Sequence, residues 1–181
     1  MSVIKPYYTE KEWKELLASM TIVCTTNEQK NEHIKAYFDK HKIKYIDKPL
    51  QTGDYCFMIP KNEELGFDRD TYFTDELMIE RKNSLTELAG SINNEAFHYE
   101  LKRSQNIRSK FLLVEQQGGW HDILTQNYRN DYNSKSYYNT MCTLMVKYEL
   151  KICFMPKEEM GLMIWSICKS ILNQYVLHGK V

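Results

Sequence analysis

Short apolar runs alternate along this chain with stretches in which apolar residues recur at helical spacing. Runs rich in β-branched or aliphatic residues and bounded by polar residues predict strands. They lie at residues 21–25, 44–46, 55–59, 76–82, 111–115 and 151–155. The polar and acidic stretch 61–75 interrupts this pattern and is interpreted as an excursion between two strands.

Apolar residues three and four positions apart predict helices between these strands. The predicted helices cover residues 9–17, 31–41, 84–103, 120–128, 134–148 and 157–177. The clearest is 84–103, where Ser84 and Glu87 form a Ser-x-x-Glu capping box ahead of an apolar stripe. Alternation of strands and helices predicts an α/β fold with a mixed central sheet and helices on both faces.

Length and composition favour one soluble domain. The chain has 181 residues without a repeat or a Pro/Gly-rich linker, so we expect a single domain over 1–181. Within it, an N-terminal helix would cover about 9–20 and the core about 21–181. No apolar run reaches the roughly 20 residues of a membrane span, and the charged N-terminus does not resemble a signal peptide. Five scattered cysteines without Cys-x-x-Cys indicate reduced thiols in a cytoplasm and argue against a zinc site.

Charge changes the picture only locally. Basic and acidic residues both number 24, which counts against a generally basic nucleic-acid-binding surface but leaves room for a basic groove beside an acidic site. Lys102, Arg103, Arg108 and Lys110 form such a cluster and are candidates for contact with DNA phosphates; a solvated helix end is the alternative. A tyrosine-rich segment, 128–138, could serve either base stacking or packing.

The candidate chemistry lies in Gly53-Asp54-Tyr55 and in Ile79-Glu80-Arg81-Lys82. On a strand, Glu80 and Lys82 point to one face and Arg81 to the other. Asp54, at the start of a neighbouring strand, could supply a second carboxylate. Two carboxylates with water and phosphate oxygens suit Mg²⁺ (or Mn²⁺), and an adjacent ammonium can orient the attacking water.

These residues, with the continuation Asn83-Ser84-Leu85 and the later run Lys110-Phe111-Leu112-Leu113-Val114-Glu115, resemble the nuclease domain of the XPF family in the PD-(D/E)xK superfamily. The resemblance is greatest to small stand-alone bacteriophage and prophage versions. It implies a restriction-endonuclease-like core and Mg²⁺-dependent endonucleolytic cleavage of DNA, often at branched or flapped structures, in the cytoplasm of a bacterial host. By position, Asp54 and Glu80 would be metal ligands, Lys82 the catalytic lysine and Arg81 a supporting basic residue.

The sequence departs from the family pattern at two places. Where the first strand of the family ends in Asp-x-Arg-Glu, this chain has Thr25-Thr26-Asn27-Glu28, so only Glu28 remains as an acid. The last Asp of the signature is also missing from its register, and Glu87 is the nearest acid, with a capping role as the alternative. A catalytically impaired relative that binds DNA or a protein is therefore the rival hypothesis. A homodimer through the apolar C-terminal half is a further expectation.

Overall fold

A seven-stranded mixed sheet forms the centre of the computed structural model, which describes residue 5 and residues 7–178. Its strands are β1 (Thr21–Cys24), β2 (Lys44–Asp47), β3 (Tyr55–Ile59), β4 (Thr71–Tyr72), β5 (Leu77–Lys82), β6 (Ser109–Glu115) and β7 (Leu150–Met155). Six of them follow the order β2-β1-β3-β5-β6-β7, and β4 pairs with β3 alone. The strand β3 is buried at every position, as expected for the centre of a sheet covered on both faces.

Strand directions determine which chain segments meet at one edge of this sheet. β1 is parallel to β2 and antiparallel to β3, β3 is antiparallel to β5, and β5, β6 and β7 run parallel. The end of β1, the start of β3 and the end of β5 therefore lie together at the same edge.

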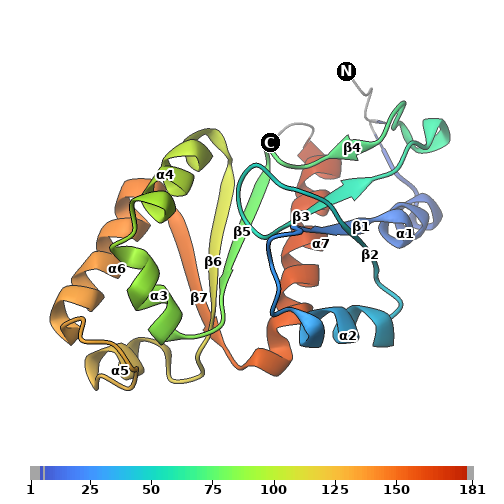
Figure 1. Cartoon of the computed structure of the whole chain (residues 1–181). Coiled ribbons are helices and arrows are strands. Elements are labelled where there is room, and N and C mark those ends of the chain that lie inside the picture. Colours follow the sequence, from blue (N-terminus) through green and yellow to red (C-terminus); the bar gives the residue numbers. More distant parts are fainter. Residues whose placement is uncertain (1–4, 6, 179–181) are drawn as a thin grey trace.

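Helices cover both faces. They are α1 (Glu10–Ser19), α2 (Glu32–Lys40), α3 (Leu85–Ile92), α4 (Glu95–Arg103), α5 (Gly119–Leu124), α6 (Ser134–Tyr148) and α7 (Met160–His178). One core joins α1, α2 and α7 to the face of β5 that carries Leu77 and Ile79. A second core joins α3, α4, α5 and α6 to the opposite face, through Met78 of β5 and Leu112 of β6. Figure 1 shows the two groups of helices, α3–α6 beside β5–β7 and α1, α2 and α7 beside β1–β3.

The α/β class, the mixed sheet and the helices on both faces are as the sequence predicted, and β3 and α6 have the predicted bounds. The prediction of one helix over 84–103 is wrong, because the chain breaks into α3 and α4 at Asn93 and Asn94. The Asn94 side chain accepts a hydrogen bond from the backbone of Ala96 and so starts a new helix. The short edge strand β4 lies inside the stretch expected to be an excursion.

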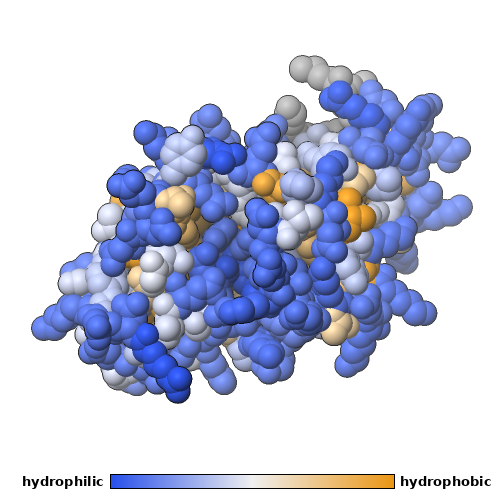
Figure 2. Space-filling view, in the orientation of Figure 1, coloured by the Kyte–Doolittle hydropathy of each residue, from blue (hydrophilic) through white to orange (hydrophobic). Residues whose placement is uncertain are grey.

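The apolar C-terminal half is largely used within the chain. The expected dimer contact rested on seven apolar residues of this half, namely Ile152, Phe154, Met155, Leu162, Met163, Trp165 and Ile167. Met155 and Ile167 are buried, while Ile152 and Phe154 pack on the second core. Met163 and Trp165 pack against the first core, and Leu162 is 48 % exposed. Hydrophobic residues form small separate spots on the face in Figure 2. None of the helices in the described part of the chain has the length and hydropathy needed to span a membrane.

Candidate active site

Gly53 and Asp54 enter β3 in a tight turn against β5. Gly53 has a left-handed backbone, with φ of 73°, and a Cβ there would lie 2.7 Å from Met78 Cγ and 2.9 Å from Ile79 O. The next residue is held twice: Asp54 N donates to Ile79 O at 2.7 Å, and Asp54 Oδ2 accepts from Arg81 N at 2.8 Å. Only glycine fits this approach without strain, and it fixes the position of the Asp54 carboxylate.

Glu80 lies across from Asp54. Tyr55 pairs with Ile79 in the antiparallel register of β3 and β5, and one further step brings Asp54 opposite Glu80. On the same face of β5, Lys82 Nζ donates to Glu80 Oε1 at 2.7 Å and lies 5.5 Å from the centroid of the Phe97 ring. The structure thus brings Asp54, Glu80 and Lys82 together at one edge of the sheet, on the side of α3 and α4.

Burial makes negative charge costly here. It raises the pKa of Glu80 to about 7, against the opposing effect of Lys82. Burial also raises the pKa of Asp54 well above its ordinary range, and the charge of Glu80 adds to that effect. For Lys82, burial acts to lower the pKa, but the contacts with Glu80 outweigh it and the net shift is upward. The Lys82 ammonium therefore stays charged, and it only partly compensates for the cost of ionising the two carboxylates beside it.

Arg81 points to the opposite face of the sheet, as strand alternation predicted. Its guanidinium is almost completely buried and pairs with Glu115 at 2.7 Å and Glu28 at 3.1 Å. His33 Nε2 approaches the same Glu115 oxygen at 2.6 Å. Arg81 therefore connects the ends of β5 and β6 to the loop after β1 and to α2, and its side chain does not share a face with those of Glu80 and Lys82.

The two departures from the family pattern have clear positions. Thr25 is 4 % exposed, and its N–H donates to Asp54 O at 2.8 Å, so this residue stands directly beside the candidate site. Glu87 is exposed at the start of α3, where it accepts a hydrogen bond from Asn83 N at 3.0 Å. Ser84 Oγ accepts from Glu87 N at 3.1 Å, so Ser84 caps α3, while the Glu87 carboxylate binds the N–H of Asn83 rather than that of Ser84, which a capping box would use. Glu28, the other candidate acid, is engaged by Arg81.

Glu100 of α4 is a site residue that the sequence reasoning missed. Its Oε1 accepts a hydrogen bond from Gly53 N at 2.8 Å, and its charge contributes to the raised pKa of Glu80. Nothing in the local sequence marks it, because the contact joins residues 47 positions apart. Glu100 braces the turn that presents Asp54.

The chemistry of these donors fits a hard divalent cation. Burial disfavours the ionisation of both Asp54 and Glu80, and the charge of Glu80 adds to that cost at Asp54, so a cation between them would relieve a real electrostatic cost. Mg²⁺ commonly takes one or two carboxylates and completes its shell with water and phosphate oxygens. Among the described residues, no group of three or more Asp, Glu, His or Cys is placed to hold a metal ion by itself. A cation here would therefore depend on Asp54, Glu80 and oxygens from outside the chain.

The expected basic cluster is only partly on the surface. Lys102, Arg103 and Arg108 are exposed, and Arg108 lies 4.0 Å from Glu76. Lys110 is 3 % exposed, and its ammonium donates to Ile107 O at 2.9 Å. The expectation that Lys110 contacts phosphate is therefore wrong, because a buried, hydrogen-bonded ammonium is not available to a surface ligand.

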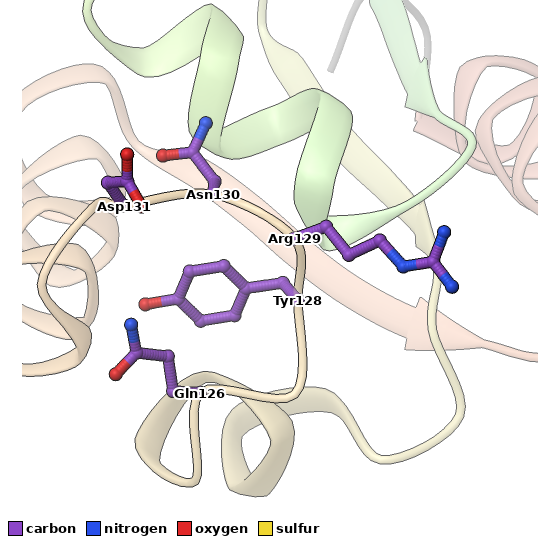
Figure 3. Close-up of a pocket in the computed structure, with 5 residues that line it drawn as sticks. All are labelled: Gln126, Tyr128, Arg129, Asn130 and Asp131. Atoms are coloured by element: carbon purple, nitrogen blue, oxygen red, sulfur yellow. The ribbon is translucent and has the colours of Figure 1, made fainter.

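The tyrosine-rich segment is used for packing. Tyr137 is completely buried and donates to Leu85 O, and the rings of Tyr128 and Tyr132 pack against it. A shallow polar concavity surrounds Tyr128, and Arg129 extends away from the Tyr128 hydroxyl (Figure 3). Because the Tyr128 hydroxyl donates to Tyr132 O at 2.6 Å, this loop is organised by its own contacts.

Comparison with known proteins agrees with this fold. Two solved structures share the fold at 18 % identity: "XPF from Aeropyrum pernix" (TM-score 0.62) and "XPF from Aeropyrum pernix, complex with DNA" (TM-score 0.59). The matches cover 86 % and 84 % of this chain, and 66 % and 65 % of those chains. The likeness confirms a restriction-endonuclease-like core.

No individual curated protein matches the sequence significantly. The profile of the ERCC4 domain matches residues 25–162, a span that contains Asp54, Glu80, Arg81 and Lys82, and the chain therefore belongs to the ERCC4 domain family.

Proposed function

We propose that this chain is a metal-dependent DNA endonuclease that hydrolyses phosphodiester bonds, with branched or flapped DNA as its substrate class. The observation that carries the proposal is the meeting of three ionisable side chains at one sheet edge, with Glu80 buried and Asp54 and Lys82 partly buried beside it. Stability alone gives little reason to bury two carboxylates and an ammonium together. Membership of the ERCC4 domain family supports the same function.

Asp54 and Glu80 would hold the cation, Mg²⁺ or Mn²⁺, which when bound would polarise the scissile phosphate and activate a water. The Lys82 ammonium, fixed by Glu80 at 2.7 Å, would orient the attacking water and offset charge that develops on the phosphate. Arg81 would act as a support, because its pairing with Glu28 and Glu115 anchors the strand that carries Glu80 and Lys82. Exposed Lys102, Arg103 and Arg108 would contact the DNA backbone.

The test uses two substitutions at the site. Glu80→Gln removes one negative charge from a nearly isosteric side chain, and Lys82→Ala removes the cation. Each is expected to lower the rate of cleavage of plasmid and branched DNA, in Mg²⁺ or Mn²⁺, by roughly 10²-fold or more. DNA affinity, measured in EDTA, should change little, because most of it would come from other basic residues.

Glu158→Gln and Lys157→Ala are the matched controls, since both residues are exposed on the turn before α7. They make the same chemical changes away from the site and should cleave at the wild-type rate. Equal cleavage by the wild type and both site variants would show that the activity is a contaminant.

Thr25 favours a second candidate function, a catalytically impaired domain that binds DNA or a protein partner. The missing acid would stand beside Asp54, where Thr25 is buried. Thr25→Asp distinguishes the two. A rise in cleavage would show that the acid is the missing component of a weak nuclease. Absence of cleavage in both wild type and Thr25→Asp, with DNA binding retained, would favour the binding domain.

We also propose that this chain resembles the stand-alone nucleases of bacteriophages and acts in the cytoplasm of a bacterial cell.

A further inference from the structure

A cleft of about 610 Å³ lies between the loop after β2, β4 and the end of α4. That volume is within the roughly 300–1,000 Å³ of ordinary ligand sites. Its lining contains two cations, Lys48 and Arg103, one tyrosine ring, Tyr72, and one carboxylate, Asp75. Hydroxyl and amide side chains supply most of the remaining lining, namely Gln51, Thr52, Thr74 and Asn106.

The cations of the cleft are free to take an anion. Lys48 and Arg103 are both exposed, and neither forms an ion pair with a carboxylate in the part of the chain that the structure describes. Lys48 Nζ donates to the Tyr72 hydroxyl at 2.7 Å, and the Arg103 guanidinium lies 5.9 Å from the Tyr99 ring, which is 64 % exposed. Each cation therefore stands beside an aromatic ring, a combination suited to a phosphate joined to a flat base.

Helix α4 connects this cleft to the candidate active site. Phe97, Glu100 and Arg103 follow one another at intervals of three, so they lie near one side of the helix. Phe97 is beside the Lys82 ammonium, Glu100 accepts from Gly53 N, and Arg103 lines the cleft. Glu100 and Arg103 are about 4.5 Å apart along the helix axis. The loop 48–52 makes the same connection, since it lines the cleft and leads into Gly53 and Asp54.

From this continuity we propose that the cleft holds one nucleotide of the DNA strand next to the bond that is cut. Lys48 and Arg103 would contact its phosphate. The Lys48 ammonium lies 4.0 Å from the centroid of the Tyr72 ring, so Tyr72 would stack on the base with its other face. The inference rests on the proposed nuclease function for the identity of the ligand. It adds a strand-holding site outside Asp54, Glu80 and Lys82, and it favours substrates with an unpaired strand, because a base must leave the duplex to reach the ring.

Binding measured without cleavage tests the cleft. Fluorescence anisotropy of a short labelled oligothymidine in EDTA gives the affinity across a salt series. The double substitution Lys48→Ala/Arg103→Ala should reduce the slope of log K against log salt by about 0.7, the contribution of one phosphate contact on a single strand, and each single substitution should reduce it by part of that amount. Lys169→Ala, on exposed α7 surface, is the control and should leave the slope unchanged.

The base contact has its own test. Tyr72→Leu should weaken oligothymidine binding about tenfold, whereas Tyr72→Phe should retain it because the ring remains. Photo-crosslinking of iodouracil DNA to the wild-type protein should map to Tyr72 by mass spectrometry. Unchanged slopes in Lys48→Ala and Arg103→Ala, or a crosslink that maps elsewhere, would overturn the proposal. Competition by free thymidine monophosphate as strong, per nucleotide, as that by the oligonucleotide would also overturn it, in favour of a free-nucleotide site.

These results separate the two proposals. If the protein binds DNA through Lys48, Tyr72 and Arg103 but never cleaves it, the cleft proposal stands and the nuclease proposal fails. If cleavage depends on Glu80 and Lys82, yet DNA binds equally well without Lys48 and Arg103, the nuclease proposal stands and the cleft proposal fails.

Discussion

Gly53 is the residue on which the geometry of the candidate site depends most directly. Its left-handed backbone lets the chain turn against Ile79 O, and its N–H is held by Glu100. The following carboxylate then receives the Arg81 N–H. A single residue without a side chain therefore determines where Asp54 stands relative to Glu80.

Gly53→Ala is expected to destabilise the protein by at least about 1 kcal/mol, because the new Cβ would combine an unfavourable φ with contacts to Met78 and Ile79. Urea denaturation gives the free energy of unfolding, and cleavage should fall as Asp54 is displaced. Gly90→Ala is the matched control. Gly90 lies inside α3, and an added Cβ would meet no neighbouring atom of the described residues within 4 Å, so alanine should stabilise by about 0.5–1 kcal/mol. Equal changes in the free energy of unfolding at the two glycines would show that the φ and the close contacts of Gly53 are not the cause.

At the scale of elements, the break between α3 and α4 matters most. Had residues 84–103 formed one straight helix, the direction of its last two turns would have been set by α3. The separate start at Asn94 gives α4 its own direction, and α4 contacts both Lys82, through Phe97, and Gly53, through Glu100. The break between α3 and α4 thus allows α4 to contact the candidate site.

Asn94→Ala should cost about 1 kcal/mol of unfolding free energy, because the Ala96 N–H loses its capping acceptor. DNA affinity should also fall, since α4 carries Arg103. Asn93→Ala is the control: Asn93 ends α3 with an ordinary φ of −92°, and its replacement should stay within about 0.5 kcal/mol. If Asn93→Ala proved as costly as Asn94→Ala, the cap would not be the cause.

For the whole molecule, the site is placed at the edge where three strands from different parts of the chain meet, with separate cores on the two faces of the sheet. A ligand held there contacts β3 and β5 together. Binding to the folded state alone should therefore stabilise the entire domain.

Mg²⁺ at about 100 times its dissociation constant is expected to raise the free energy of unfolding by about 2.7 kcal/mol, and the melting temperature by roughly 5–10 °C. Differential scanning fluorimetry measures the shift. Glu80→Gln should remove most of it, while Glu158→Gln, an exposed control, should retain it. A full shift in both variants would place the cation elsewhere.

Pairing of two chains stays a prediction at this scale. Apolar residues remain exposed on two helices of the C-terminal half, Met145 and Val146 on α6 and Leu162 and Leu177 on α7, and Met163 and Trp165 of α7 are partly buried. We expect light scattering at tens of micromolar to give twice the mass of one 21.6 kDa chain, and Leu162→Lys to return it to the monomer. Leu124→Lys, exposed on α5, is the control. A monomeric wild type would end the dimer hypothesis.

The sequence by itself determined the local features of this protein. Alternation along β5 predicted that Glu80 and Lys82 share a face opposite Arg81, because side chains on a strand alternate whatever lies around them. The apolar runs predicted the strands because a strand covered on both faces is apolar at consecutive positions. Asn93 and Asn94 also carried a local signal for a helix break, which the apolar stripe through 84–103 concealed.

Only the tertiary structure decided which distant residues meet. Glu100 reaches Gly53, Glu115 and Glu28 enclose Arg81, and Lys110 turns inward to Ile107 O. Lys48 and Arg103 likewise line one cleft although 55 positions separate them. Such contacts depend on strand order and helix direction, which are set by the packing of two cores on one sheet, and no spacing along the chain encodes them.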